Sequence, residues 1–557
     1  MYLWYDNNIR RDTVKDKTMK KNSFVTGAFI TTLGIVISKI LGIVYVIPFH
    51  AVIGEQGGAL YGYAYTIYAL FMSLATAGIP LAMSKIVSEY QTLGYYSAKK
   101  RAFKIGKKVA LLLGFICFLV LLLFAPLLAK AILGDLVGGN TIEDVTFVIR
   151  VISIAILVVP VLSIYRGYFE GHRFMSPPSI SQVIEQIVRV LVIVLGSFLT
   201  LKVFKLSLTS AVGVALVGAT IGALVSYFYL VDKRYRNKKK FDEKVRNVNE
   251  PIITDKMIFR KLIIYAVPFI LIDIFKSLYN YIDMVTVVQG LVEHAKFSVS
   301  DAETVMSMIS TWSSKFNMII LSVSTGVIVS LIPNLTQSVV KKDNKDVNKK
   351  INQALGILLF LMLPMTIGLS FLAEPVWMLF YGTSKFGPSV LAYFIFVGLI
   401  MGLFTAAISI VQVMKDYKTV FISLVTGVII KFLLNTGMIN TFHQYGMPGY
   451  YGVITASILA YLVSFIICLV SLNIKYKVEY EDTVKNFMDI LCGCMLMIVV
   501  LFLMKFIIPI VSTTRIVNLF IILGYSIVGV IVYLLFTLKL GTIKNVFGDK
   551  LNKLFKK

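Results

Sequence analysis

Long apolar runs separated by short polar connections dominate this sequence from residue 24 to residue 538. A helix needs about 20 predominantly apolar residues to cross the hydrocarbon core of a bilayer. Windows of that kind cover residues 24–50, 61–83, 109–132, 145–168, 179–201, 208–231, 262–290, 305–340, 351–381, 389–414, 419–439, 452–472, 487–511 and 516–538. The pattern therefore predicts an all-α polytopic membrane protein with fourteen transmembrane helices.

The polar connections between these windows alternate between strongly basic and nearly uncharged. The N-terminal segment, the C-terminal tail and the connections containing "KKRAFKIGKK", "DKRYRNKKKFDEKVR" and "KKDNKDVNKK" all fall on one side if every window crosses the membrane. About 42 of the 55 Lys and Arg residues are then on that side, and about 6 are on the other. By the positive-inside rule we predict a multi-pass protein with both termini in the cytoplasm.

Parts of the sequence resemble each other, which indicates an internal repeat. "LATAGIPLAMSKIVSEY" recurs loosely as "SVSTGVIVSLIPNLTQSVV", and "SISQVIEQIVRVL" aligns with "FISLVTGVIIKFL". The second alignment places Arg189 opposite Lys431. Each copy holds six windows, an even number, so both copies enter the membrane in the same direction and form parallel repeats.

The repeat defines the predicted domain organisation. The six parts are a cytoplasmic N-terminal segment (1–23), an N-lobe (24–231), a cytoplasmic linker (232–261), a C-lobe (262–472), the last two windows with their preceding loop (473–538) and a cytoplasmic tail (539–557). The last two windows have no counterpart in the N-terminal copy. The predicted architecture is thus two six-helix lobes plus two extra C-terminal helices.

Composition narrows the class of function. Hydrophobic residues make up 57% of the chain and the mean hydropathy is +0.82, which is too apolar for a soluble multi-domain protein. The formal net charge of +26 lies between apolar runs rather than on a soluble face, so no nucleic-acid partner is predicted. All four cysteines lie within apolar runs, and neither a metal site nor another cofactor is predicted.

Charged residues inside the apolar windows are the candidate functional residues, because an ionised side chain at the bilayer centre costs about 2.5 to 3.5 kcal/mol. The candidates are Lys39, Arg150, Glu185, Arg189, Asp273, Lys276, Asp283, Lys315, Lys431 and Lys505. Five of them come from the first, seventh and eighth windows and would meet at the junction between the lobes if those windows line it.

Spacing separates candidate ion pairs from unpaired cations. Two pairs have helical spacing that allows mutual neutralisation, namely Asp273 with Lys276 and Glu185 with Arg189. Lys39 and Lys315 have no carboxylate within four residues on their own helices. For these two lysines an external anion and a structural role both remain open.

Four stretches of the sequence resemble a known family. "SKILGIVYVIPFHAVIG", "ATAGIPLAMSKIVSEY", "RGYFEGHRFMSPPSISQVIEQIVRV" and "GVIVSLIPNLTQS" together resemble the MurJ/SpoVB/YtgP group of lipid-linked oligosaccharide flippases, whose superfamily includes the MATE drug exporters. The resemblance extends from residue 24 to about residue 538. It implies MATE-like lobes, a monomer in a bacterial plasma membrane, and movement of lipid II from the inner to the outer leaflet. Lipid II is the undecaprenyl-diphosphate-linked precursor of peptidoglycan.

The same resemblance implies roles for two lysines. The family has a basic residue of the central cavity in an S-(R/K)-x-L-G pattern of helix 1, and Lys39 occupies that position. A second basic residue lies in helix 8 before a stretch ending in "LIP", and Lys315 occupies it. Gram-negative members have an Arg-Asp pair where this chain has Tyr45 and Val46, and an arginine in helix 2 that has no match here.

The remaining charged candidates are assigned by inference from these two. Lys276 is a third candidate for binding the diphosphate, whereas Asp283, Glu185 and Arg189 are candidates for coupling or gating. A negatively charged head group is driven outward in an inside-negative cell by about 2.3 kcal/mol per charge per 100 mV. A returning Na⁺ or H⁺ is left open. The last two helices are expected to form an apolar groove for the prenyl chain.

Three alternatives remain open from the sequence. The chain is a flippase for another polyprenyl-linked glycan, a cation-coupled MATE-type multidrug exporter, or a membrane lipid-sugar transferase. A drug exporter normally has twelve helices and an acidic cavity, whereas this sequence predicts fourteen helices and a basic site. The sequence contains neither a Gly-rich phosphate loop nor an H-E-x-x-H motif, so we predict that the chain is not an enzyme.

Overall fold

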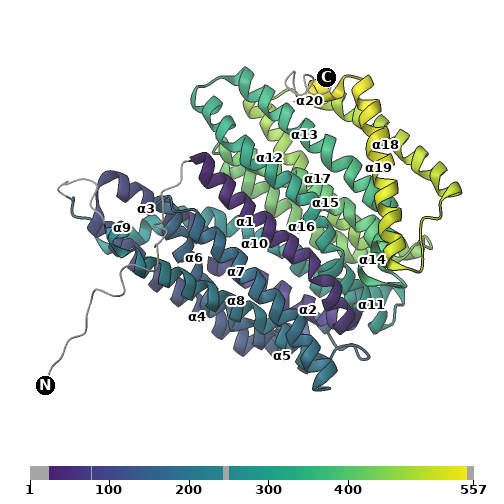
Figure 1. The fold of residues 1–557 in the computed structure, drawn as a ribbon, viewed down its shortest axis with the longest axis horizontal. Coiled ribbons are helices and arrows are strands. Elements are labelled where there is room, and N and C mark those ends of the chain that lie inside the picture. Colours follow the sequence, from purple (N-terminus) through teal and green to yellow (C-terminus); the bar gives the residue numbers. More distant parts are fainter. Residues whose placement is uncertain (1–23, 77, 243–249, 548–557) are drawn as a thin grey trace, which may run out of the picture.

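The chain folds into helices, with no strand among the residues that the computed structural model describes, namely 24–76, 78–242 and 250–547. Figure 1 shows two helical halves, one coloured purple to teal and the other green. The last long helices, in yellow, lie at the edge of the green half. The expectations for residues 1–23 and for the end of the C-terminal tail lie outside the described residues.

The N-terminal half contains the helices up to the predicted linker. They are α1 (Phe24–Val44), α2 (Val46–Thr76), α3 (Ile79–Leu93), α4 (Tyr96–Leu133), α5 (Ile142–Ser153), α6 (Ala155–Gly171), α7 (Ser176–Leu191), the π-helical turns η1 (Val192–Gly196) and η2 (Leu199–Val203), and α8 (Leu208–Arg236). A short helix, α9 (Lys238–Asp242), follows in the linker.

The C-terminal half begins with a helix that includes the end of the predicted linker. Its elements are α10 (Asp255–Ala295), α11 (Val299–Ser307), the π-helical turn η3 (Met308–Trp312), α12 (Ser314–Val340), α13 (Asn344–Phe371), α14 (Ala373–Tyr381), α15 (Gly387–Val413), α16 (Tyr417–Gln444), α17 (Gly449–Tyr476), α18 (Glu481–Ile507), α19 (Arg515–Lys539) and α20 (Thr542–Phe547). α18 and α19 pack on α13 and α14.

Twelve stretches of the described chain are helices long and apolar enough to cross a membrane. One of them, Val46–Leu93, joins α2 and α3, while α10 is not among the twelve. α1 contributes a shorter apolar helix, Leu33–Val44. The predicted all-α polytopic membrane protein is therefore confirmed, and the count of fourteen helices stays a prediction.

Two glycines shape the chain after α1. Gly54 has a φ of +65° inside α2 and marks a sharp kink there. Gly78, before α3, has a φ of +71°, and a Cβ at this position would lie 2.6 Å from the carbonyl oxygen of Ala266 in α10. Glycine is the residue that tolerates both the left-handed backbone and the close approach, so α3 starts tightly against α10.

The two halves meet along α2 and α10. α2 packs against α10, α11 and η3, and α10 in turn packs against α3 and α4 of the N-terminal half. α1 packs mainly on α7 and makes a smaller contact with α12. α2 therefore lies next to the start of the eighth predicted membrane window, and α1 makes a smaller contact with its continuation, α12.

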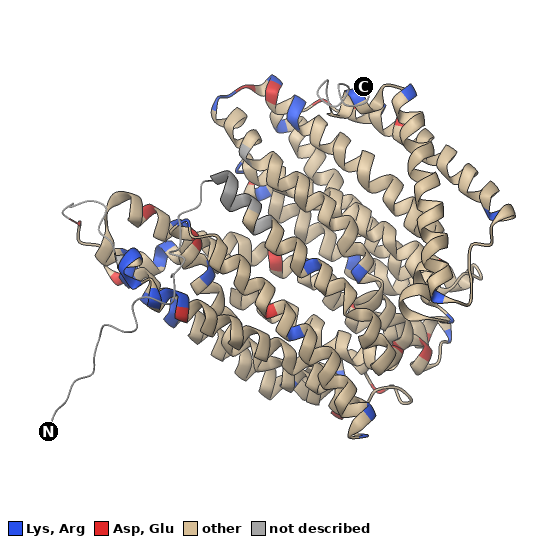
Figure 2. Cartoon of the chain, viewed as in Figure 1, with Lys and Arg blue, Asp and Glu red and all other residues tan. Residues whose placement is uncertain are grey.

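Charged residues concentrate at the ends of the helices. Figure 2 shows Lys and Arg gathered around α3, α4 and α9 and near the connection between α12 and α13, whereas the long helix surfaces are mostly uncharged. A few charged residues also lie midway along the helices. This distribution agrees with the basic connections predicted from the sequence. The few charged residues midway along the helices are therefore the ones to examine as functional candidates.

Candidate functional site

Lys39 lies on α1, five residues before the end of that helix. Its side chain is half-buried. In the described part of the chain, no carboxylate oxygen lies within the 4.0 Å of an ion pair. The hydroxyl oxygen of the neighbouring Ser38 is buried without a hydrogen-bond partner. Two consecutive residues of α1 thus hold a cation without an ion-pair partner and a hydroxyl without a hydrogen-bond partner in the described structure.

Lys315 lies in the first turn of α12, directly after η3. Its Nζ is 5.6 Å from the centroid of the Tyr45 ring, which follows the end of α1. Tyr45 is buried, and it occupies the position where Gram-negative relatives were expected to have a charged residue. Lys315 also has no carboxylate within 4.0 Å among the described residues. The structure therefore brings the end of α1 next to Lys315 through a cation–π contact.

Lys276 and Asp273 lie on α10, which joins the two halves. The ion pair predicted from their spacing does not form, since no Asp273 oxygen lies within 4.0 Å of Lys276 Nζ in the described structure. The next residue, Ser277, exchanges a hydrogen bond with Ser73 of α2, with the two oxygens 2.8 Å apart. Lys276 is therefore a further cation near the junction, with no ion-pair partner among the described residues.

Glu185 and Arg189 form the predicted pair on α7, and a third residue joins them. Arg189 donates to Glu185 Oε1, and Arg166 of α6 donates to Glu185 Oε2 at 2.7 Å. The three side chains are 12 to 16% exposed. Sequence reasoning missed Arg166, although it lies within an apolar window. The cluster holds two guanidinium groups and one carboxylate, so it keeps one unit of positive charge.

A row of tyrosines on α2 faces this cluster. The rings of Tyr61 and Tyr65 stack with centroids 5.6 Å apart, and those of Tyr65 and Tyr68 are 5.6 Å apart at a tilt. All three hydroxyl groups interact electrostatically with Arg189. The tyrosines of α2 and the charged cluster of α6 and α7 therefore form a polar, aromatic region within the N-terminal half.

Asp283 is paired within the C-terminal half, with a partner that the sequence analysis did not assign to it. Its Oδ1 lies 2.5 Å from Nζ of Lys431 on α16, and Asn435 donates to the same oxygen at 3.1 Å. Lys431 also donates to Ser457 and its side chain has no exposure. Packing of α10 against α16 causes this pairing, because it places the two charges together away from solvent. Its charge is already matched there.

The two halves are joined by hydrogen bonds at the end opposite the basic connections. Glu303 of α11 is fully buried and accepts from the backbone N and the side-chain Nδ2 of Asn140, at 2.9 and 3.0 Å. The Tyr63 hydroxyl donates to the same carboxylate at 3.3 Å. Thr311 donates to the carbonyl oxygen of Gly58 at 3.0 Å. These contacts hold α2 and the α4–α5 connection against α11 and η3.

An apolar cavity lies between α13, α18 and α19. Its volume is about 500 Å³, and its lining includes Leu361, Met365, Leu501, Ile522 and Val530. This is the place where the sequence analysis expected an apolar groove beside the last two helices. Among the described residues, no group of three His, Cys, Asp or Glu side chains could hold a metal ion.

Sequence comparisons find relatives over most of the chain. The profile of a family described as polysaccharide biosynthesis protein matches residues 24–331. A Bacillus subtilis (strain 168) protein named lipid II flippase MurJ is 36% identical over 477 residues, which covers 84% of this chain and 85% of that protein. The uncharacterized membrane protein YabM of the same organism is 28% identical over 438 residues, or 77% of each chain.

Solved structures share the fold. One of lipid II flippase MurJ, in an inward closed conformation, matches with a TM-score of 0.63 over 92% of this chain and 99% of that chain, at 17% identity. A MATE multidrug transporter of the MOP superfamily, in an inward-facing conformation, matches with a TM-score of 0.60 over 81% of this chain and 98% of that chain, at 11% identity.

The chain therefore shares the helical fold of these MurJ and MATE structures. This agrees with the prediction that the chain is not an enzyme, since the named relatives are flippases and transporters. The chain belongs to the MurJ/SpoVB/YtgP family, as the four sequence stretches predicted.

Proposed function

We propose that this protein is a lipid II flippase, which moves the undecaprenyl-diphosphate-linked precursor from the inner to the outer leaflet by alternating access. The 36% identity to the Bacillus subtilis flippase supports this substrate. The observation that carries the mechanism is the meeting of α1 and α12, where Lys39 and Lys315 are left without carboxylate partners in the described structure.

In this proposal the lysines bind the diphosphate. Lys39 and Lys315 donate charge-assisted hydrogen bonds to its oxygens, and Lys276 contributes from α10. Hydrogen bonds that involve charged groups contribute about 1.5 to 3 kcal/mol each. Contacts from both halves give the substrate a way to favour one arrangement of the halves over another, because its affinity then differs between them.

The prenyl chain occupies the apolar cavity between α13, α18 and α19. This cavity is lined almost wholly by apolar side chains and lies on the two helices that have no counterpart in the repeat. A polyprenyl chain can occupy this cavity without a desolvation penalty, because the lining has few polar groups. The head group thus contacts α1, α10 and α12, whereas the prenyl chain lies against α13, α18 and α19.

The proposed topology has fourteen crossings, two parallel six-helix repeats and both termini in the cytoplasm. The twelve candidate spans together with α1 and α10 give this number. The hydrogen bonds around Glu303 then close the outer side, so this conformation receives substrate from the cytoplasmic side. We further propose that the protein acts as a monomer.

Energy for the cycle comes from the membrane potential in this proposal. Outward movement of each negative charge is favoured by about 2.3 kcal/mol per 100 mV in an inside-negative cell. The same membrane potential opposes the return of the empty basic site to its starting position. In this proposal the inward movement of a counter-ion, Na⁺ or H⁺, compensates for that cost. The cluster of Glu185 and Arg189 is the candidate for this coupling, because Asp283 is already neutralised by Lys431.

The test is an accessibility assay for lipid II in cells depleted of their own flippase. Expression of this chain is expected to restore labelling of lipid II by a membrane-impermeant probe on the outer face. The lysines recognise the diphosphate and not the sugar, so a flippase for another polyprenyl-diphosphate glycan is the second candidate. Accumulation of unlabelled lipid II in cells that contain the protein in normal amounts would exclude lipid II and favour that candidate.

A further inference from the structure

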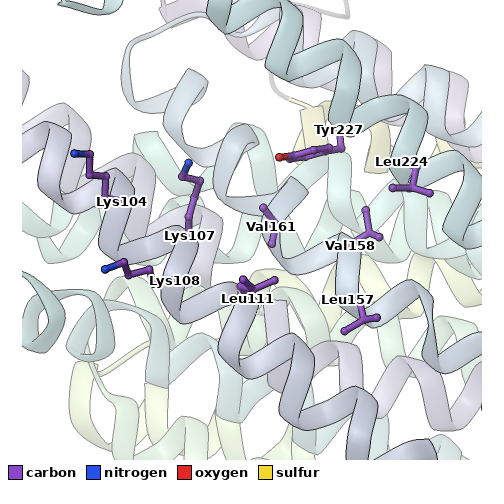
Figure 3. A pocket seen from close by; sticks show the side chains of 9 residues that line it. All are labelled: Lys104, Lys107, Lys108, Leu111, Leu157, Val158, Val161, Leu224 and Tyr227. Carbon is purple, nitrogen blue, oxygen red and sulfur yellow. The ribbon is translucent and has the colours of Figure 1, made fainter.

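A groove on the N-terminal half has a basic end and an apolar end. It is formed by α4, α6 and α8 and has a volume of about 480 Å³. Figure 3 shows Lys104, Lys107 and Lys108 at one end and Leu157 and Leu224 at the other. The other lining residues are Leu111, Val158, Val161 and Tyr227. This groove contains none of the residues assigned above to substrate or coupling.

The three lysines at the basic end present charge that the protein does not neutralise. Lys107 and Lys108 lie three and four residues after Lys104, so both are neighbours of Lys104 on the surface of α4. None has a carboxylate oxygen within 4.0 Å in the described part of the chain. Lys104 and Lys108 are exposed, while the Lys107 Nζ lies 5.1 Å from the Phe103 ring centroid. The groove therefore offers three ammonium groups to a ligand.

Two neighbouring basic residues of the same run differ from these three lysines, because each has partners within the protein. Lys99 is fully buried and donates to the carbonyl oxygen of Phe241 at 2.8 Å and to Gln91 at 2.6 Å. Arg101 pairs with Asp255 at 3.2 Å. The positive-inside rule needs only basic charge on this side of the membrane. It does not account for three unpaired lysines at the mouth of a groove.

The groove runs from the level of lipid head groups into the hydrocarbon region. Seven residues separate Lys104 from Leu111, which corresponds to about 10 Å along a helix. Leu111 is 56% exposed, and Val225 and Phe228 on α8 are 40% and 63% exposed. An exposed apolar surface beside the groove is what lipid chains contact. All three helices belong to one half, so a ligand here stays bound while the halves move relative to each other.

We propose that this groove binds an anionic phospholipid of the inner leaflet, with its phosphate on the three lysines and an acyl chain along the apolar end. Clusters of basic side chains at the cytoplasmic surface attract anionic lipids, at about 1 kcal/mol per Lys or Arg. The apolar lining from α6 and α8 suits an acyl chain. A soluble anion has no such chain and would leave this part of the groove empty. The bound lipid holds the cytoplasmic end of the N-terminal half at the membrane surface.

The experiment measures lipid binding to the purified full-length protein by native mass spectrometry. The probes are dioleoyl-phosphatidylglycerol, which is anionic, and dioleoyl-phosphatidylcholine, which carries the same chains without net charge. The variant K104Q/K107Q/K108Q is expected to lose phosphatidylglycerol affinity by about tenfold or more, with phosphatidylcholine binding unchanged. The control K341Q/K342Q/K345Q removes three exposed lysines near the α12–α13 connection and is expected to keep wild-type affinity.

Equal losses in the two lysine variants, or none in either, would overturn the proposal. Val161→Trp fills the apolar end without a change in charge and is expected to lower phosphatidylglycerol affinity as well. Wild-type affinity in this variant would show that no chain lies in the groove, and the site would then take a free phosphate. If undecaprenyl diphosphate displaces phosphatidylglycerol from the wild type at equal concentration, the groove serves the substrate class and the assignment to phospholipid is wrong.

Discussion

α7 and α16 are counterparts in the predicted repeat, and each carries a basic residue at the aligned position. In α7, Arg189 shares the carboxylate of Glu185 with Arg166, and these side chains are 12 to 16% exposed. In α16, Lys431 has no exposure and pairs with Asp283 of α10. The first cluster has two guanidinium groups for one carboxylate and keeps a net positive charge. The second is neutral and closed.

The difference separates charges that stabilise the fold from charges that are free to act. A buried charge must be matched, because an unpaired one costs several kcal/mol. Lys431 meets this requirement fully, and Arg189 meets it in part. Lys39 and Lys315 are only partly buried and have no carboxylate partner within the described structure, and they lie on α1 and α12, which contact each other. We therefore expect transport to depend most on the least matched cations.

The largest expected effect is that of Lys39→Glu or Lys315→Glu on transport. Each change removes a donor to the diphosphate and adds a repulsive charge. We expect a loss of at least about tenfold in outer-leaflet lipid II, since one such hydrogen bond contributes about 1.5 to 3 kcal/mol. The measurement is the impermeant-probe assay in flippase-depleted cells. Lys39→Arg and Lys315→Arg serve as controls and should retain activity. Normal labelling with either glutamate variant, at equal protein level, would sink the assignment.

The second effect is on stability and concerns the closed pair of the C-terminal half. Lys431→Met leaves the Asp283 carboxylate buried and unpaired, so we expect a destabilisation of about 3 to 5 kcal/mol. The double variant Asp283→Leu, Lys431→Met replaces the pair with apolar groups and should recover most of that loss. Apparent melting temperature in detergent measures both.

Transport by the double variant then decides what the pair does. If the pair is structural, the double variant should move lipid II at close to the wild-type rate. A variant that melts like the wild type but fails to transport would show that Asp283 takes part in coupling. The pair in the C-terminal half would then have a functional role, and the distinction from the cluster in the N-terminal half would be wrong.

The third effect is smaller and concerns the open cluster of the N-terminal half. Glu185→Gln leaves Arg166 and Arg189 facing each other without a carboxylate. Because the cluster is partly exposed, we expect a destabilisation of about 1 to 3 kcal/mol, less than for Lys431→Met. Arg166→Gln should cost less again, since Glu185 keeps Arg189. A larger loss for Arg166→Gln than for Glu185→Gln in the same melting assay would contradict this order.

The sequence predicted features that depend on local pattern. The window 208–231 became α8, Leu208–Arg236, because a long apolar run has to be helical in lipid. The pair of Glu185 and Arg189 follows from a spacing of four residues on one helix. Arg166 was also within reach, because an intramembrane cation can be recognised from its place in an apolar window.

Other features of the site depend on packing between distant elements. Asp273 and Lys276 have suitable spacing but form no ion pair, since spacing permits a contact while the surroundings of each side chain decide it. The pairing of Asp283 with Lys431 joins α10 and α16, which are far apart in the chain. No local pattern contains that contact. The sequence could therefore indicate a helix at the junction for Asp283, but it could not indicate the pair with Lys431.

The smallest expected effect on stability concerns the N-terminal ends of α7 and α16, the two helices compared above. Asp416 caps α16, accepting from the Thr419 backbone N at 3.3 Å and from Lys475 Nζ at 2.5 Å. α7 has no side-chain cap and begins with prolines instead. Partial burial alone would raise the pKa of Asp416, but hydrogen bonds from Lys475 and Thr419 lower it to about 2.

Asp416→Ala is therefore expected to destabilise the protein by about 1 kcal/mol at neutral pH. The folded pKa is lower than the value of about 3.9 in an unfolded chain, so this contribution is complete above about pH 4 and disappears as the pH falls toward 2. Melting of Asp416→Ala and wild type should differ at pH 7 and converge in that acidic window. Asp135→Ala, at a carboxylate that is 94% exposed, is the matched control and should follow the wild type at every pH. A difference between Asp416→Ala and wild type that stays constant down to pH 2 would mean that Asp416 acts through packing and not through its charge.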